Sequence, residues 1–360
     1  MEIEHRVGQL ILIGVPGTEV DAEARDLLES VQPGGVLLSA RNIESPHQVL
    51  ELTTSIRAAV QVPPLIAVDQ EGGRVDRLRE IYSAMPSADL VRASGDASMA
   101  DRLGEITAEG LRMLGFNVNL APVLDVAVDD SAENGLKGRY FGDSAAQVVR
   151  LAGAYLEGLQ RGGVVGAGKH FPGLGATLPD SHSDLPSVDL TRDQVLRHHV
   201  APYTELFSKI NARLNALLVA HAHYPAFDGP SPLPASLSKN IVTGLLRDEL
   251  GFKGLAITDD LEMGAITSAR SVGDAAVMAI EAGLDMVMVT GTTESAVLAW
   301  QTMTTAAREG RILKTSISRA FDHIARVKAM LSPPHSATEL GISRLRERIA
   351  EMNRLLQHSK

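Results

Sequence analysis

Eight short apolar runs recur along the chain of 360 residues, and stretches with helical spacing separate them. Their near-continuous apolar character is typical of strands that are buried on both faces. Eight such strands, each followed by a helix, predict an α/β fold, a single (β/α)₈ TIM-type barrel, rather than an open doubly wound sheet. No G-x-G-x-x-G follows the first run, which counts against a dinucleotide-binding fold. The runs are LILIG from Leu10, GGVLL from Gly34, PLIAVD from Pro64, NVNLAPV from Asn117, VVGAGKH from Val164, NALLVAHAH from Asn215, GLAITDD from Gly254 and LDMVMV from Leu284.

The stretches between the runs have amphipathic helical patterns. Val148, Ala152, Tyr155 and Leu159 share one helical face, and two glycines follow as a stop signal. After the last strand, helical patterns continue to the C-terminus. We expect residues 1–331 to form the barrel, and residues 332–360 to form a linker and an extra helix that packs on it.

Charge and composition narrow the range of partners. A net charge of −10 repels phosphate groups, so we expect no nucleic acid partner and no anionic membrane partner. The absence of cysteine excludes disulfides, thiolate metal sites and a cysteine nucleophile. The apolar run near the N-terminus is too short for a signal peptide or a membrane span. These features predict a cytoplasmic protein.

Polar side chains follow several of the predicted strands. In a barrel of this kind the reacting groups lie where strands end and the following loops begin. Charge beside a buried core must be paired or used, so several such positions together indicate a functional site. The candidates are Asp69 after strand three, Asp125 and Arg139 after strand four, Lys169 and His170 at strand five, His221 at strand six, and Asp259 and Asp260 at strand seven.

The stretch 171–190 has neither helical nor strand periodicity. Long loops of this kind are usually functional lids or linkers, and its apolar residues favour a lid. Within it, the carboxylate of Asp180 is close enough in sequence to orient the imidazole of His182, which then delivers a proton near neutral pH. The alternative is a surface loop in which Asp180 caps a turn. This pair alone leaves both interpretations open.

The segment KHFPGLGATLPDSHSDLP, residues 169–186, resembles the K-H-F-P-G-H-G…D-S-H motif of glycoside hydrolase family 3, in its bacterial β-N-acetylglucosaminidase (β-hexosaminidase) branch. The resemblance spans roughly residues 1–330 in unbroken order, and it implies a (β/α)₈ barrel. It extends over AVDQEGGRVDRL, GFNVNLAPVLDV, GRYFG, LVAHAHYPAFD, PASLS and LGFKGLAITDDLEMGAI.

The resemblance also implies a retaining, two-step mechanism. Asp259, the first aspartate of TDD, is then the nucleophile that forms a covalent glycosyl-enzyme. His182, held by Asp180, is the general acid that protonates the leaving oxygen and then the base that activates water. The family commonly has histidine at the position of Leu174, so this departure puts loop packing or leaving-group preference in doubt.

Sugar-binding roles carry over by the same resemblance. Asp260, Glu71 and His221 are expected to support the site rather than to touch the sugar, and Met263 is expected in the cavity wall or the core. The residues that would bind a terminal N-acetylglucosamine are Asp69, Arg77, Arg139, Lys169 and His170.

The resemblance implies an exo-β-N-acetylglucosaminidase that acts on peptidoglycan-derived muropeptides during cell-wall recycling. Its partner is a small carbohydrate, no cofactor and no metal are expected, and a monomer is expected with a dimer left open. A phosphorylase with the same intermediate and a non-catalytic sugar-binding homologue stay as alternatives. A third alternative is a metal-dependent amidohydrolase, suggested by the H-x-H of His221 and His223, although in such barrels the paired histidines lie on the first strand.

Overall fold

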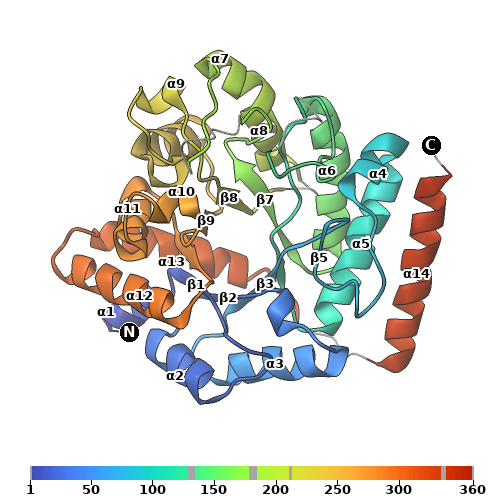
Figure 1. The fold of residues 1–360 in the computed structure, drawn as a ribbon, viewed down its shortest axis with the longest axis horizontal. Coiled ribbons are helices and arrows are strands. Elements are labelled where there is room, and N and C mark those ends of the chain that lie inside the picture. The colour runs from blue at the N-terminus through green and yellow to red at the C-terminus, as the bar shows by residue number, and fades with distance from the viewer. Residues whose placement is uncertain (1, 129–133, 178–184, 211–212, 334–337, 359–360) are drawn as a thin grey trace.

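The chain folds into a closed barrel of eight parallel strands surrounded by helices, so the predicted (β/α)₈ TIM-type barrel is confirmed (Figure 1). The computed structural model describes residues 2–128, 134–177, 185–210, 213–333 and 338–358. Each predicted apolar run coincides with one barrel strand, although β7 extends one residue beyond its run. In their order around the barrel these are β1 (Ile11–Gly14), β10 (Met286–Val289), β9 (Leu255–Asp260), β8 (Ala216–Val219), β7 (Val165–Phe171), β6 (Val118–Asn119), β3 (Leu65–Val68) and β2 (Gly35–Leu38).

Helices form a ring outside the barrel (Figure 1). The predicted amphipathic stretch around Val148 is α6, whose predicted inward residues are all buried. None of the described helices has both the length and the apolar character that a membrane span needs. The longer helices are α1 (Ile3–Gly8), α2 (Ala22–Val31), α3 (Pro46–Ala58), α4 (Ala88–Ser94), α5 (Ala97–Met113), α6 (Ala145–Arg161), α8 (Ala201–Ser208), the π-helix η4 (Asn240–Glu249), α11 (Val272–Ala282), α12 (Thr293–Arg308), α13 (Lys314–Lys328) and α14 (Glu339–Gln357).

Two short segments, α7 (Arg192–Gln194) and the π-helical η2 (Val195–Val200), run directly into α8 and form one helical stretch with it. The other short helical segments are η1 (Ala40–Asn42), α9 (Pro225–Asp228), η3 (Ala235–Leu237) and α10 (Gly264–Thr267).

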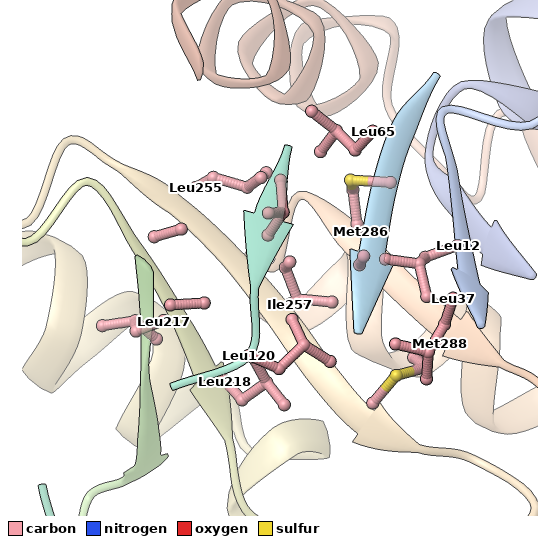
Figure 2. Packing of buried hydrophobic residues seen from close by; sticks show 14 of the residues in the cluster. Leu12, Leu37, Leu65, Leu120, Leu217, Leu218, Leu255, Ile257, Met286 and Met288 are labelled. Atoms are coloured by element: carbon pink, nitrogen blue, oxygen red, sulfur yellow. The ribbon is translucent and has the colours of Figure 1, made fainter. Parts of the chain in front are cut away.

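Apolar side chains fill the inside of the barrel. Figure 2 shows leucine, isoleucine and methionine side chains from several strands meeting between the ribbons. Because these side chains fill the interior, it is a packed core and not a channel. Burying one such side chain stabilises the fold by about 1.5–3 kcal/mol. Leu218 and Met288 belong to it and also line the cavity described below. The top of the core is therefore the floor of that cavity.

A small antiparallel hairpin, β4 (Gln70–Gly72) and β5 (Val75–Asp76), follows β3. The Gln70 side chain is fully buried, and its Nε2 donates to Asp76 Oδ1 over 2.8 Å. The backbone N–H of Gln70 donates to Asn119 Oδ1 over 2.9 Å, which ties the hairpin to β6. These two bonds fix Gln70, and therefore hold the next residue, Glu71, at the end of the barrel.

The C-terminal helix α14 packs on the outside of the barrel against α5 and α4 (Figure 1). One of its faces is buried, because its apolar residues recur at helical spacing. Arg346 donates to the Ile81 carbonyl over 2.6 Å and fixes the helix at its middle. The boundary at 331/332 stays a prediction. The buried face consists of Ile342, Leu345, Ile349, Met352 and Leu356.

Candidate active site

A cavity of about 330 Å³ opens at the carboxyl end of the barrel strands. Its volume lies at the lower end of the range for small-molecule sites. Six of the eight predicted site residues line it, although they come from five separate stretches of the chain. The six are Asp69, Arg77, Arg139, Lys169, His170 and Asp259. The rest of the lining is Glu71, Val75, Asn134, Gly135, Leu136, Leu174, Leu218, Met263 and Met288.

The other two predicted residues, Asp180 and His182, lie outside the described residues. The root of their loop is described, because β7 ends at Phe171 and the chain can be followed to Thr177. Within this root, Leu174 faces the cavity. The predicted roles of Asp180 and His182 stay predictions.

A buried network of charges forms one side of the cavity. Lys169 Nζ, on β7, lies 2.5 Å from Asp69 Oδ1 and 2.7 Å from Glu71 Oε1. The Arg139 guanidinium donates to both oxygens of the same Glu71 carboxylate over 2.8 Å. This fork geometry is the strong form of an arginine–carboxylate pair. The network fixes three cavity side chains, Asp69, Lys169 and Arg139, before any sugar arrives.

The network keeps its members charged. Burial raises the pKa of Glu71, but the charges and hydrogen bonds of Lys169 and Arg139 have the larger effect and lower this pKa to about 2. Burial lowers the pKa of Lys169, but Asp69 and Glu71 outweigh it and raise that pKa above its ordinary value. At neutral pH the cavity therefore presents fixed cations and anions, which suits recognition of hydroxyl groups.

Asp259 lies near the end of β9 and lines the cavity. Burial raises its pKa, but the charges of His170 and His221 and the backbone N–H of Asp260 outweigh burial, so the pKa lies below the ordinary value. That N–H donates to Asp259 Oδ1 over 2.9 Å. The carboxyl group is thus ionised at neutral pH, as a nucleophile must be.

The neighbouring Asp260 has a different environment from Asp259. Its carboxyl group is bonded to the Thr290 hydroxyl and accepts from the Glu262 N–H over 3.0 Å. Burial raises its pKa. Of the two aspartates in TDD, only Asp259 lines the cavity.

The family model for the glycosyl hydrolase family 3 N-terminal domain matches residues 2–327. The chain belongs to glycosyl hydrolase family 3. The predicted family is confirmed, and with it the prediction of a glycoside hydrolase of the β-N-acetylhexosaminidase class.

Curated family 3 relatives carry the name β-hexosaminidase. The one from Idiomarina loihiensis is 37% identical over 283 residues, which cover 78% of this chain and 83% of the relative. The one from Pseudomonas aeruginosa is 37% identical over 293 residues, which cover 80% of this chain and 84% of the relative.

Solved family 3 structures have the same fold. A β-N-acetylglucosaminidase from a Paenibacillus species is 35% identical with a TM-score of 0.89, and the match covers 98% of this chain and 69% of that one. A β-N-acetylhexosaminidase from Beutenbergia cavernae is 29% identical with a TM-score of 0.83, and the match covers 91% of this chain and 99% of that one.

The position that departs from the family motif, Leu174, joins a small apolar cluster beside the cavity. The side chain packs against buried Ala127, Leu136 and Tyr140. Leu136 also lines the cavity, and Arg139 follows three residues later. In this family 3 enzyme, Leu174 therefore links the loop root to the segment that carries Arg139.

The two histidines of the H-x-H, on which the amidohydrolase alternative depends, are held by hydrogen bonds. His221 Nδ1 lies 2.7 Å from Ser236 Oγ, and its Nε2 lies 3.0 Å from the Asp260 carbonyl oxygen. His223 Nδ1 lies within hydrogen-bond distance of the backbone of Leu233. Across the described parts of the chain, no three histidine or carboxylate side chains are grouped to hold a metal ion.

Glu71, which was expected to support the site, bonds to both Lys169 and Arg139 and also lines the cavity. Its place in VDQEGGRVD, directly after a strand end that carries Asp69, was the available signal. Asp125, a candidate to which no role was assigned, lies 2.7 Å from His170 Nδ1.

Proposed function

We propose that this β-N-acetylhexosaminidase is a retaining exo-enzyme that removes terminal non-reducing N-acetylglucosamine from peptidoglycan-derived muropeptides. The supporting observation is the ionised carboxylate of Asp259 beside the preformed charge network of Lys169, Glu71 and Arg139. A fixed polar clamp next to an ionised carboxylate is what a covalent glycosyl transfer to the enzyme requires.

In the first step an Asp259 oxygen attacks the anomeric carbon, and the bond to the leaving oxygen breaks. His182, protonated, gives its proton to that oxygen. In the second step water attacks the anomeric carbon of the glycosyl-enzyme, and His182 takes the proton of this water while the bond to Asp259 breaks. Two displacements at one carbon restore the original anomeric configuration. Asp180 orients His182 throughout.

The sugar is held by complementary donors and acceptors. Asp69 accepts hydrogen bonds from ring hydroxyls, whereas Lys169, Arg139 and Arg77 donate to hydroxyl or carbonyl oxygens. His170 completes the clamp next to Asp259. A sugar that lacks one of these hydroxyls leaves a buried charge without its partner, which weakens binding strongly.

The exo mode is supported by the size of the cavity. A volume of about 330 Å³ accommodates one sugar ring with its acetamido group and leaves the rest of the substrate outside. We infer that the remainder is a 1,6-anhydro-N-acetylmuramic residue joined through a β-1,4 linkage, met during wall recycling in the cytoplasm by a monomeric enzyme. The alternative acceptor is phosphate, which gives a phosphorylase through the same intermediate.

The test is cleavage of an aryl β-N-acetylglucosaminide and of the disaccharide N-acetylglucosaminyl-β-1,4-anhydro-N-acetylmuramic acid. Proton NMR of the first turnovers should show β-N-acetylglucosamine, and the rate should not change when phosphate is added. A rate that rises with added phosphate would indicate a phosphorylase. An absence of turnover on both substrates would favour the non-catalytic sugar-binding homologue. Release of internal fragments from a polymer would contradict the exo mode.

A further inference from the structure

Asp125 lies in the connection after β6 and is the most enclosed carboxylate next to the cavity, with no exposed surface. It accepts from three N–H groups of one segment. These are the backbone N–H of His170 at 3.2 Å, His170 Nδ1 at 2.7 Å and the backbone N–H of Leu174 at 2.6 Å. Two of the three donors are backbone N–H groups, so hydrogen bonds hold this segment to Asp125 in addition to the contact with the imidazole.

The contact with Asp125 determines the tautomer and the orientation of the His170 imidazole. A carboxylate only accepts hydrogen bonds, so Nδ1 is the donor and carries the proton. Nε2 is then the nitrogen left for the cavity, which His170 lines together with Asp259. A carboxylate behind a histidine is a common way to fix the tautomer and the ring orientation.

The same carboxylate holds the root of the loop that carries Asp180 and His182. Leu174 is bonded to it directly, and the neighbouring Gly173 carbonyl accepts from the Tyr224 hydroxyl over 2.8 Å. At Gly175 the backbones approach so closely that a Cβ atom would lie 1.9 Å from the Val126 carbonyl oxygen. The root is therefore fixed against the segment 125–126.

We propose that Asp125 is a positioning residue that sets the His170 imidazole with Nε2 toward the sugar and ties it to the root of the catalytic loop. One carboxylate thereby fixes a sugar-binding group and the start of the acid-bearing loop relative to each other. This role rests on the proposed function, because it assigns the sugar to the cavity and the proton transfer to the loop.

The test variant is Asp125→Asn. Asparagine keeps the size of the side chain but has only one acceptor oxygen, and an NH₂ group replaces the other. It can therefore accept a hydrogen bond from His170 Nδ1 or from the Leu174 N–H, but not from both through separate oxygens. A matched control is Asp285→Asn at the opposite end of the barrel. Asp285 is equally buried and accepts from His323 Nδ1 over 2.9 Å, from Arg247 over 2.6 Å and from the Ala256 N–H over 2.9 Å.

On an aryl β-N-acetylglucosaminide we expect kcat/KM to fall about 100-fold in Asp125→Asn, the loss that a misplaced catalytic geometry causes. The control should keep the wild-type kcat/KM, although both variants lose stability. Equal kcat/KM values in the two variants would overturn the proposal.

A second measurement uses the wild-type protein and does not depend on activity. With ¹⁵N-labelled histidine and leucine, the ring signals of His170 and the amide signal of Leu174 are assigned by their loss in His170→Gln and Leu174→Met, at a pH of about 8.5 where an ordinary histidine is neutral. We expect the proton on Nδ1, and slow exchange of the Leu174 amide proton. A proton on Nε2 with a bare Nδ1 would overturn the proposal even if Asp125→Asn fails to fold. If the wild type cleaves no N-acetylglucosaminide, the proposed function fails, whereas these spectra still decide what Asp125 does.

Discussion

Lys169 Nζ lies 2.5 Å from Asp69 Oδ1, and the two residues are 100 positions apart in the chain. The bond joins the end of β7 to the residue that follows β3. The Lys169 side chain is only 3% exposed, so its charge needs both this partner and Glu71. The sugar clamp is therefore also a structural connection between distant strands, and changes in it affect stability as well as binding.

Glu71→Gln should lose stability in a pH-dependent way. The pKa of Glu71 is about 2 in the folded protein and about 4.5 when unperturbed. A depressed carboxyl pKa stabilises the fold above the unperturbed value, and this contribution fades as pH falls from about 4.5 to 2. The shift corresponds to about 3 kcal/mol of unfolding free energy at pH 7. Urea unfolding at pH 7 and at lower pH should show the difference between variant and wild type shrinking in that window.

A control for this experiment is Glu105→Gln. Glu105 also pairs with an arginine, Arg161, at 2.7 Å, but its side chain is 42% exposed. Exposed pairs contribute about 0–1 kcal/mol, so this variant should unfold nearly as the wild type does. If Glu71→Gln were no less stable than Glu105→Gln, the buried network would not have the role described above.

His182→Ala should discriminate between substrates by their leaving groups. Without the acid, a sugar leaving group has no proton source, whereas an activated aryl group leaves as a stable anion. General acid catalysis contributes about 10²–10⁴-fold, so kcat/KM should fall by that factor on the disaccharide and far less on an activated aryl glycoside. Comparing the two substrates with both enzymes checks this. Equal losses would show that His182 is not the acid.

Metal removal should leave the activity unchanged. Within the described residues no three histidine or carboxylate side chains are grouped to hold a metal ion, and hydrogen bonds engage both ring nitrogens of His221 and Nδ1 of His223. Incubation with a strong chelator, followed by gel filtration and assay on an aryl β-N-acetylglucosaminide, is the measurement. A loss of rate that added zinc restores would contradict the proposed mechanism.

The barrel was predictable because a strand buried on both faces must be an apolar run, and eight such runs are separated by amphipathic helices. The places of Asp69, Lys169 and Asp259 followed from the fold, since the carboxyl ends of barrel strands meet at one face. Topology alone brings these three residues into one cavity.

Two features were beyond sequence reasoning. The hairpin that carries Glu71 consists of strands of three and two residues in a polar segment, which is too short for any periodicity to be seen. The bond between Asp125 and His170 spans 45 positions and joins a residue in irregular structure to a strand end. Neither feature has a local signature, because both depend on side-chain contacts that exist only in the folded protein.

The nucleophile can also be tested by removal. Asp259→Ala should reduce kcat to near the uncatalysed rate while the fold is kept, because the covalent step loses its only attacking group. Circular dichroism and thermal unfolding check the fold, and an aryl β-N-acetylglucosaminide checks the rate. Near-normal activity would refute this role for Asp259.

The most direct measurement is mass spectrometry of the wild-type protein after incubation with 5-fluoro-N-acetylglucosaminyl fluoride, which forms the intermediate faster than water removes it. The expected result is a gain in mass equal to one fluorinated sugar, carried by the peptide that contains Asp259. A sugar attached to another residue, or no attachment in an enzyme that releases product with inverted anomeric configuration, would contradict it.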